Sequence, residues 1–258
     1  MLYQVNAGPL YEWLMKSGLP YLLSYFYFRK LTSYFPNKPM LDSGAYSAMT
    51  LGKPINIDEY TAWLKLHNGA YGVAVNLDVI NNPEVTYENQ KYMESKGLQV
   101  LPCFHIKSPL KHLQQYIDEG YTYIGLGAVV GSSMVTKIKF LNHCFELGKK
   151  ENIKFHGFGV GLNTANKFPF YSIDNSNATI SVSIGRFVKN NQTIYTGNYS
   201  RKRPTDIGKQ TRNRIVEVFG AQAKHFAAQY EKNVKRNQLM YYSYFGEDLT
   251  DEICGLCG

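Results

Sequence analysis

The chain has 258 residues, 28 lysine and arginine residues against 20 acidic ones, a formal net charge of +8, and 21 tyrosines. This length is normal for a single α/β barrel, and the positive balance makes a polyanionic partner plausible. The four cysteines (Cys103, Cys144, Cys254 and Cys257) are too few and too scattered for a secreted disulfide scaffold, which favours a reducing compartment.

The beginning of the chain carries no basic segment followed by an apolar core and a cleavage site. Its most apolar stretch, residues 19–28, is interrupted by Pro20 and Ser24 and is too short to span a bilayer. We therefore expect a soluble, cytoplasmic protein without a membrane partner; its oligomeric state is left open.

Alternating and apolar runs predict about eight strands along the chain. They cover residues 1–6, 39–42, 71–78, 98–105, 121–127, 153–160, 170–174 and 179–187. Helical spacing predicts helices at residues 10–16, 21–34, 59–67, 83–96, 110–119 and 133–150. Asn56 or Asp58 is expected to cap the third of these helices. Strands that alternate with helices indicate a parallel sheet covered on both faces, and this count favours a single (β/α)8 TIM-type barrel over an open sheet.

The composition changes near residue 190. Residues 191–204 are polar and include the basic run 201–203, and residues 205–237 form a basic segment with helical spacing. We predict a barrel core at 1–190 and a basic helical C-terminal extension at 191–258 that packs on the barrel or completes it.

Polar or glycine residues follow most of the predicted strands and would meet at one rim of a barrel. They are Asp42, Asp78, His105, Gly127, Gly159 and Asp174. Two carboxylates that flank one carbon are suited to glycosidic-bond chemistry, and glycines let the backbone approach a flat ligand. Tyr46 and Phe158 follow strand ends and are placed to sandwich a planar ring.

Simpler interpretations stay open for single residues. Asp42 precedes a Ser-Gly turn, and its side chain could have the purely structural role of accepting hydrogen bonds from the amides of that turn. His156 could be a core histidine whose hydrogen bonds are satisfied within the protein. The Gly-Leu-Gly run at 125–127 lacks the acidic partner that a dinucleotide loop needs about twenty residues further on. No signature of a P-loop, a zinc protease or a serine hydrolase is present.

Four segments resemble motifs of the tRNA-guanine (queuine) transglycosylases and of their phage relatives that act on DNA. Residues 42–46 are similar to the family's Asp-Ser-Gly-Gly-Phe/Tyr motif, and 127–131 to its Gly-Leu-Ala-Val-Gly loop. Residues 158–161 resemble its Met-Gly-Val-Gly turn, and 172–174 the strand that bears the nucleophile. The segments follow the family's order, and the chain is most similar to the small phage-type DNA 7-deazaguanine transglycosylases.

The resemblance implies a catalytic role for two carboxylates, with Asp174 as the nucleophile and Asp42 as the general acid/base. Asp78 would read the amide edge of the base, and His105 matches a base-reading side chain by position only. The substrate-binding residues implied are Ser43, Tyr46, Asp78, His105, Gly127, Ala128, Phe158 and Gly159.

The chain departs from the family at two places. The family's Pro-Thr-Arg motif after the nucleophile is replaced by residues 175–179, and no zinc-ligand cluster lies between Asp174 and Glu252. Cys254 and Cys257 have metal-ligand spacing, but a structural zinc site needs two more ligands. We therefore predict no metal site and no required cofactor, with a structural zinc at this cysteine pair as the less favoured alternative.

The predicted activity is the exchange of guanine in nucleic acid for a free 7-deazaguanine base through a covalent glycosyl-Asp intermediate. DNA is favoured over tRNA as the polymer because the tRNA enzymes' zinc-bearing insertion is missing and basic residues follow the barrel instead. The nucleic-acid-binding residues would be Arg186, Arg201, Lys202 and Arg203. The alternatives are a tRNA-guanine transglycosylase, a hydrolytic nucleic-acid glycosylase, and a non-catalytic nucleic-acid-binding subunit. If a phage encodes the protein, it would act in the host cytoplasm.

Overall fold

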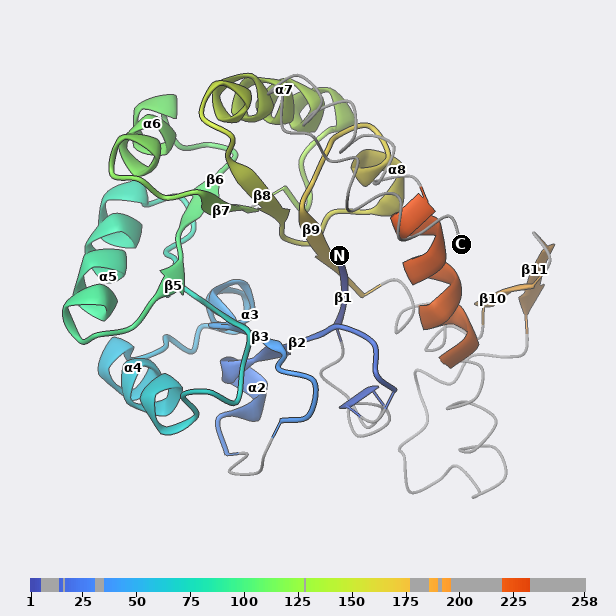
Figure 1. Cartoon of the computed structure of the whole chain (residues 1–258), viewed down its shortest axis with the longest axis horizontal. Helices are drawn as coiled ribbons and strands as arrows, with labels where there is room; N and C mark the ends of the chain where they lie inside the picture. Colours follow the sequence, from blue (N-terminus) through green and yellow to red (C-terminus); the bar gives the residue numbers. More distant parts are fainter. Residues whose placement is uncertain are drawn as a thin grey trace, which may run out of the picture.

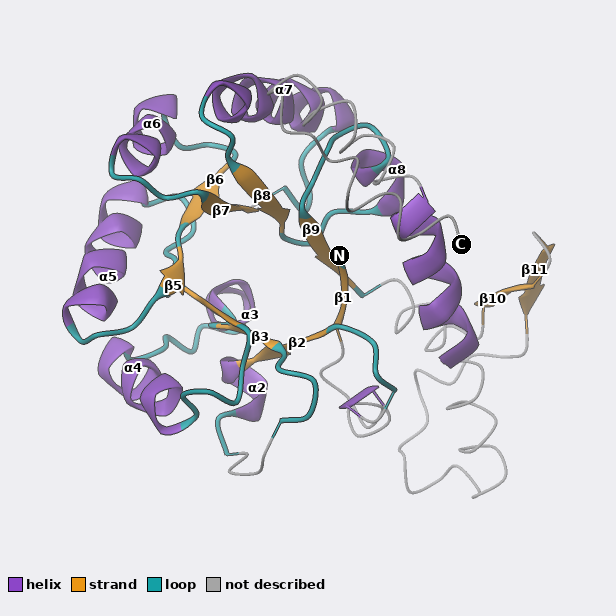
Figure 2. Ribbon diagram, in the orientation of Figure 1, coloured by secondary structure: helices purple, strands orange, loops and turns teal. Residues whose placement is uncertain are grey.

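Nine short parallel strands form a nearly closed barrel, and helices surround it (Figures 1 and 2). The structure, a computed structural model, describes residues 1–5, 14–15, 17–30, 35–127, 129–176, 186–189, 192–195 and 220–232. The barrel strands are β1 (Leu2–Val5), β2 (Tyr21–Ser24), β3 (Met40–Asp42), β4 (Val73–Val75), β5 (Val100–Leu101), β6 (Cys103–His105), β7 (Tyr123–Gly127), β8 (Lys154–Gly157) and β9 (Ser172–Asn175). The predicted α/β class and TIM-like barrel are confirmed.

Three differences turn the eight predicted strands into the nine of the barrel. Strand β2 was not predicted, the strand predicted at 179–187 is not among the described barrel strands, and Pro102 divides the predicted strand at 98–105 into β5 and β6. Proline has no amide hydrogen and interrupts the ladder. The strand order is β5-β4-β3-β2-β1-β9-β8-β7-β6, so the two ends of the sheet meet at this proline. The carbonyl of Leu101 accepts from the amide of Asn76 at 3.0 Å, and the carbonyl of Pro102 accepts from the amide of Gly125 at 2.8 Å. This stretch of chain therefore contacts both neighbouring parts of the ring.

The helix predicted at 21–34 was wrong in its first part, and the strand predicted at 179–187 lies mostly outside the described residues. The helix predicted at 21–34 begins as strand β2, where Tyr21, Leu22 and Leu23 are all buried. Continuous burial is typical of a parallel strand covered on both faces, and a short apolar run alone does not distinguish it from a helix. Residues 179–185 of the strand predicted at 179–187 are not described. Its last two residues, Arg186 and Phe187, belong to β10 (Arg186–Lys189), which pairs antiparallel with β11 (Gln192–Tyr195).

The main outer helices lie where the sequence predicts them. The short helix α2 lies within the helix predicted at 21–34, whereas α3 and α8 were missed. The helices are α2 (Tyr25–Phe28), α3 (Ala45–Thr50), α4 (Ile57–Leu66), α5 (Pro83–Ser95), α6 (Leu110–Asp118), α7 (Met134–Lys150) and α8 (Leu162–Ala165). Asn56 is the N-cap of α4, because its side chain accepts from the amides of Asp58 at 2.8 Å and Glu59 at 3.1 Å.

One part of the predicted C-terminal extension packs on the barrel. Residues 220–232 form a helix, drawn in orange-red in Figure 1. The Gln4 side chain donates to the carbonyl of Ala223 at 3.4 Å, and the Tyr230 hydroxyl donates to the carbonyl of Phe170 at 3.2 Å. This helix therefore contacts β1 and the segment that leads into β9.

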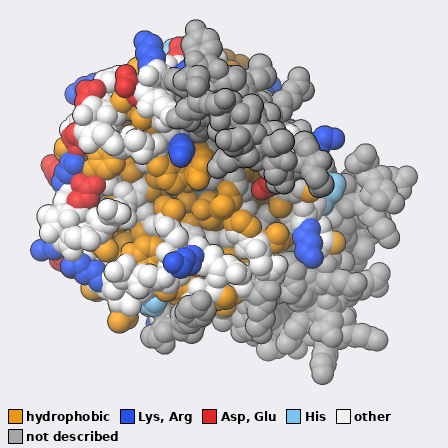
Figure 3. Space-filling view, viewed as in Figure 1, with side chains coloured by type: hydrophobic (Ala, Val, Ile, Leu, Met, Phe, Trp, Pro, Cys, Tyr) orange, Lys and Arg blue, Asp and Glu red, His pale blue; other side chains and the backbone are white. Residues whose placement is uncertain are grey.

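The core has an inner and an outer part. The inner cluster consists of buried strand residues, namely Leu22, Met40, Val75, Leu101 and Cys103, and two larger clusters lie between the strands and the helices. Figure 3 shows hydrophobic side chains gathered in the middle of one face, with charged side chains mostly around them. Within the described ranges, no helix has the length and apolar character needed to cross a membrane.

Candidate active site

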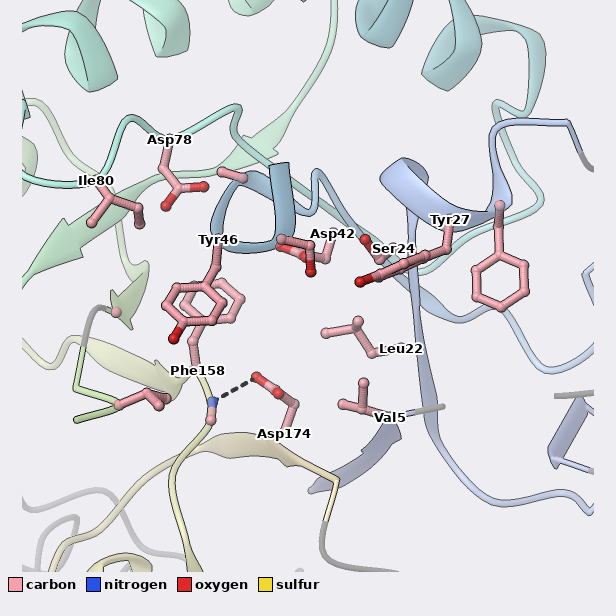
Figure 4. Close-up of a pocket in the computed structure, with 16 residues that line it drawn as sticks. Val5, Leu22, Ser24, Tyr27, Asp42, Tyr46, Asp78, Ile80, Phe158 and Asp174 are labelled. Carbon is pink, nitrogen blue, oxygen red and sulfur yellow. Dashed lines mark hydrogen bonds between the residues drawn. The ribbon is translucent and has the colours of Figure 1, made fainter. Parts of the chain in front are cut away.

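A cavity of about 230 Å³ lies where the carboxyl ends of the strands meet (Figure 4). Ligand sites usually measure about 300–1,000 Å³, so this cavity suits one small planar ligand better than a dinucleotide. The predicted site residues that line it are Asp42, Tyr46, Asp78, Gly127, Phe158, Gly159 and Asp174. Three carboxylates predicted from separate strand ends are thus brought to one cavity.

Asp42 is the last residue of β3, and its Oδ2 accepts a hydrogen bond from the amide of Gly44 at 2.9 Å. Burial raises the pKa of Asp42 to about 8, with further contributions from the charges of Asp78 and Asp174, while the amides of Gly44 and Ser43 act in the opposite direction. Asp42 therefore accepts a hydrogen bond from a turn amide, as the simpler interpretation expected, and its raised pKa also favours the protonated form at neutral pH.

The turn after Asp42 requires glycine. Gly44 has φ +81°, and a Cβ there would lie 2.3 Å from Ser24 Oγ and 2.5 Å from Phe26 Cβ. We predict that Gly44→Ala lowers the free energy of unfolding by about 2–5 kcal/mol, the sum of left-handed strain and overpacking. Gly52→Ala is the matched control, because φ is +62° but no described heavy atom lies within 4 Å of its added Cβ. It should cost only about 1–2 kcal/mol; equal losses in urea denaturation of the two variants would contradict the steric argument.

Asp78 follows β4, and two buried side chains contact its carboxylate oxygens. Ser43 Oγ donates to Asp78 Oδ1 at 3.4 Å, and His105 Nε2 lies 2.9 Å from Oδ2. Ser43 and His105 were predicted to bind substrate directly, but neither is among the residues that line the cavity. A Cβ on Gly127 would lie 3.0 Å from His105 Cδ2, so this glycine leaves room for the imidazole ring.

Asp174 lies on β9 with only 8% of its surface exposed. Its Oδ1 contacts two groups, the amide of Gly159 at 3.2 Å (dashed in Figure 4) and His156 Nε2 at 3.2 Å. Among the residues that the structure describes, Oδ2 accepts no hydrogen bond. One carboxylate oxygen is therefore fixed, and the other has no hydrogen-bond partner among the described residues. His156 is fully buried, as expected of a core histidine, but its contact with Asp174 was missed.

Two aromatic rings predicted to flank a planar ligand both line the cavity. Tyr46 is 53% exposed on α3, while Phe158 packs edge-on against His156 with ring centroids 4.5 Å apart. A Cβ on Gly125 would lie 2.3 Å from Phe158 Cε2, so this glycine is needed for the position of the ring. That the two rings sandwich a ligand stays a prediction.

The cavity also has walls that the sequence did not indicate, including Leu22, Ser24 and Tyr27. These residues were overlooked because they fall in the segment 21–34 that was predicted to be one helix. The buried Ser24 Oγ has no hydrogen-bond partner within the described part of the chain.

Several predicted residues lie outside the described residues: Ala128, Arg201, Lys202, Arg203, Cys254 and Cys257. Arg186 is described only as the first residue of β10. Across the described ranges, no group of three or more His, Cys, Asp or Glu side chains is placed to hold a metal ion. No protein-family model matches the chain, and no curated protein matches it.

Proposed function

We propose that this protein is a base-exchange transglycosylase that replaces guanine in nucleic acid with a 7-deazaguanine derivative. The observation that carries the proposal is the pair of carboxylates, Asp42 and Asp174, in one cavity of a size suited to a single base. Their surroundings differ: the pKa of Asp42 is raised to about 8, whereas Asp174 keeps one oxygen without a donor among the residues that the structure describes. Paired carboxyl groups in different environments are the usual basis for dividing acid/base and nucleophilic roles.

In the first half-reaction, Oδ2 of Asp174 attacks C1′ of the target nucleotide, and the bond from C1′ to the guanine nitrogen breaks. Protonated Asp42 gives its proton to the leaving guanine, so a neutral base departs and a glycosyl-Asp ester remains. In the second half-reaction, ionised Asp42 takes the proton from the ring nitrogen of an incoming 7-deazaguanine. That nitrogen attacks C1′, Asp174 leaves as a carboxylate, and two inversions give net retention. One glycosidic bond replaces another, so the proposed reaction consumes no nucleoside triphosphate and involves no oxidation or reduction.

The other residues of the cavity would bind the base. The carboxylate of Asp78 would accept from its amide edge, with Ser43 and His105 fixing the orientation of that carboxylate. Tyr46 and Phe158 would stack on the ring, and the backbone at 127–128 would contact its carbonyl. Because the cavity lies within the barrel rim, the target nucleotide would have to leave the base stack to reach it.

DNA is the polymer we favour, with the basic residues of the C-terminal extension as its phosphate contacts. This assignment includes Arg186 and residues 201–203, and it agrees with a phage enzyme that modifies DNA in the host cytoplasm. Neither a metal nor a redox cofactor is part of the proposed reaction.

The decisive experiment measures release of labelled guanine from duplex DNA, single-stranded DNA and tRNA, with and without candidate 7-deazaguanines. We expect release from DNA that depends on the added base, and incorporation of that base. Release without incorporation would indicate a hydrolytic glycosylase, exchange confined to tRNA would overturn the choice of DNA, and binding without release would indicate a binding subunit.

Charge reversal tests the phosphate contacts separately. Arg201→Glu with Arg203→Glu should weaken DNA binding and reduce the slope of log K against log salt by about 2, while the choice of base is unchanged. The matched control reverses two exposed lysines of α7, Lys139 and Lys150, and so changes the net charge equally. An equal loss of binding in both double variants would show a general charge effect and contradict the assigned contact.

A further inference from the structure

A chain of hydrogen bonds runs from Asp174 through three neighbouring strands. His156 Nε2 lies 3.2 Å from Asp174 Oδ1, and His156 Nδ1 lies 2.7 Å from Ser172 Oγ. Ser172 Oγ is in turn 2.6 Å from the hydroxyl of Tyr123. His156 is the register partner of Ser172 across β8 and β9, and of Gly125 across β8 and β7. The arrangement therefore follows from the pairing of the strands.

The partners at each end favour one direction for the protons. Burial raises the pKa of Tyr123 well above its usual value, so its hydroxyl keeps its proton and can donate to Ser172. In the arrangement that gives the Asp174 carboxylate a donor from a neutral ring, Ser172 donates to Nδ1 of His156 and the imidazole proton lies on Nε2, which faces Asp174. The opposite direction would turn the lone pair of Nε2 toward the carboxylate and leave Oδ1 without this donor.

The ring of His156 has little freedom to move. Its residue is fully buried, and the rings of Tyr3 and Phe158 pack against it with centroids 5.9 Å and 4.5 Å away. Phe158 lines the cavity, whereas His156 does not. The imidazole thus contacts the carboxylate and the aromatic wall of the site without being exposed to a ligand.

We infer that His156 is a positioning residue, held by Ser172 and Tyr123 as the Nε2–H tautomer, which fixes Oδ1 of Asp174 and leaves Oδ2 to attack. The role of Asp174 as the attacking group rests on the proposed function, but the proton arrangement does not. An imidazole N–H that is held in place before the substrate binds lowers the free-energy cost of orienting the carboxylate during the reaction.

The proton arrangement is tested by ¹⁵N NMR of histidine-labelled protein, with His156→Gln used to assign the signals. We expect the wild-type spectrum to show a proton on Nε2 of His156 and none on Nδ1. Ser172→Ala should shift the population toward the Nδ1–H tautomer, and Tyr123→Phe should cause a smaller shift. A wild-type His156 that is protonated on Nδ1, or a tautomer unaffected by Ser172→Ala, would overturn the inference whether or not the protein exchanges bases.

Kinetics test the positioning role. His156→Leu should lower kcat about 10²-fold with little change in KM, because one fixed donor is lost and no residue that lines the cavity is replaced. His156→Gln should recover part of kcat, since its amide can still donate to Asp174. His67→Gln is the control: His67 is also buried, with Nδ1 2.8 Å from the carbonyl of Trp63 on α4, and its loss should lower the urea midpoint but not kcat.

Equal values of kcat in the His156→Leu and His156→Gln variants would overturn the positioning role. If the wild type shows the Nε2–H tautomer but exchanges no base with any polymer, the hydrogen-bond chain is supported and the nucleophilic role of Asp174 is wrong. The failure of the proposed function is thereby distinguished from the failure of this inference.

Discussion

Replacement of Asp174 by asparagine is expected to abolish base exchange, with a loss in kcat of about 10⁴-fold or more, as for the removal of other enzymatic nucleophiles. The physical reason is that a neutral amide oxygen does not form the glycosyl ester, although asparagine has nearly the same shape. It can still accept at Oδ1 from the amide of Gly159, which lies 3.2 Å away in the wild type. The loss should therefore arise from chemistry and not from altered folding.

Two measurements check this result. Guanine release from labelled nucleic acid reports turnover, and mass spectrometry of the denatured protein reports a covalent adduct on the peptide that contains Asp174. Asp118→Asn, which changes an exposed carboxyl on α6, is the matched control and should leave both unchanged. An adduct that persists in Asp174→Asn would move the nucleophile to another carboxylate of the cavity.

The barrel was largely predictable because most of its strands end in recognisable turns. The apolar stretch at 71–78 contains β4, and Asn56 caps α4 where a cap was expected. The segment at 21–34 was mistaken for a helix because closely spaced aromatic and apolar residues satisfy both periodicities. Its first part is a strand in the structure because parallel neighbours on both sides satisfy its backbone, and a single sequence does not display those neighbours.

The site was predictable at the level of strand ends but not of contacts between strands. Asp42, Asp78 and Asp174 each follow an apolar run. That pattern was enough to predict that they lie at one rim, and all three line the same cavity. The contacts that His105 and His156 make with Asp78 and Asp174 depend on strand register, which the sequence does not specify. A usable signal did exist: Ser172 and Asp174 are two residues apart on a strand and so face the same side, where both contact one histidine.

Asp42→Asn should have the second large effect, a fall in kcat of about 10²–10⁴-fold, which is the usual contribution of general acid/base catalysis. Without a proton donor, the departure of guanine is slow; without a base, the incoming 7-deazaguanine keeps its proton. Any glycosyl-enzyme that does form should therefore accumulate instead of turning over. Mass spectrometry should detect this adduct in Asp42→Asn, and rapid discharge of the adduct by the added base would contradict the assignment of Asp42 as the acid/base.

The same substitution has a consequence for stability that does not depend on activity. The pKa of Asp42 is raised from 3.8 in an ordinary carboxyl group to about 8 in the folded protein, so between these values the folded state holds a proton that the unfolded state has lost. The contribution of Asp42 to the free energy of unfolding must then fall as the pH rises through this window, by at most about 1.4 kcal/mol per pH unit. Asparagine does not titrate, so urea denaturation should show Asp42→Asn gaining stability relative to the wild type as the pH rises from 5 to 8, and the difference should level off above that range. Asp118→Asn should show no such trend. Parallel curves for the wild type and Asp42→Asn would mean that Asp42 is already ionised at neutral pH, and the proton donated to the departing guanine would then have to come from another group.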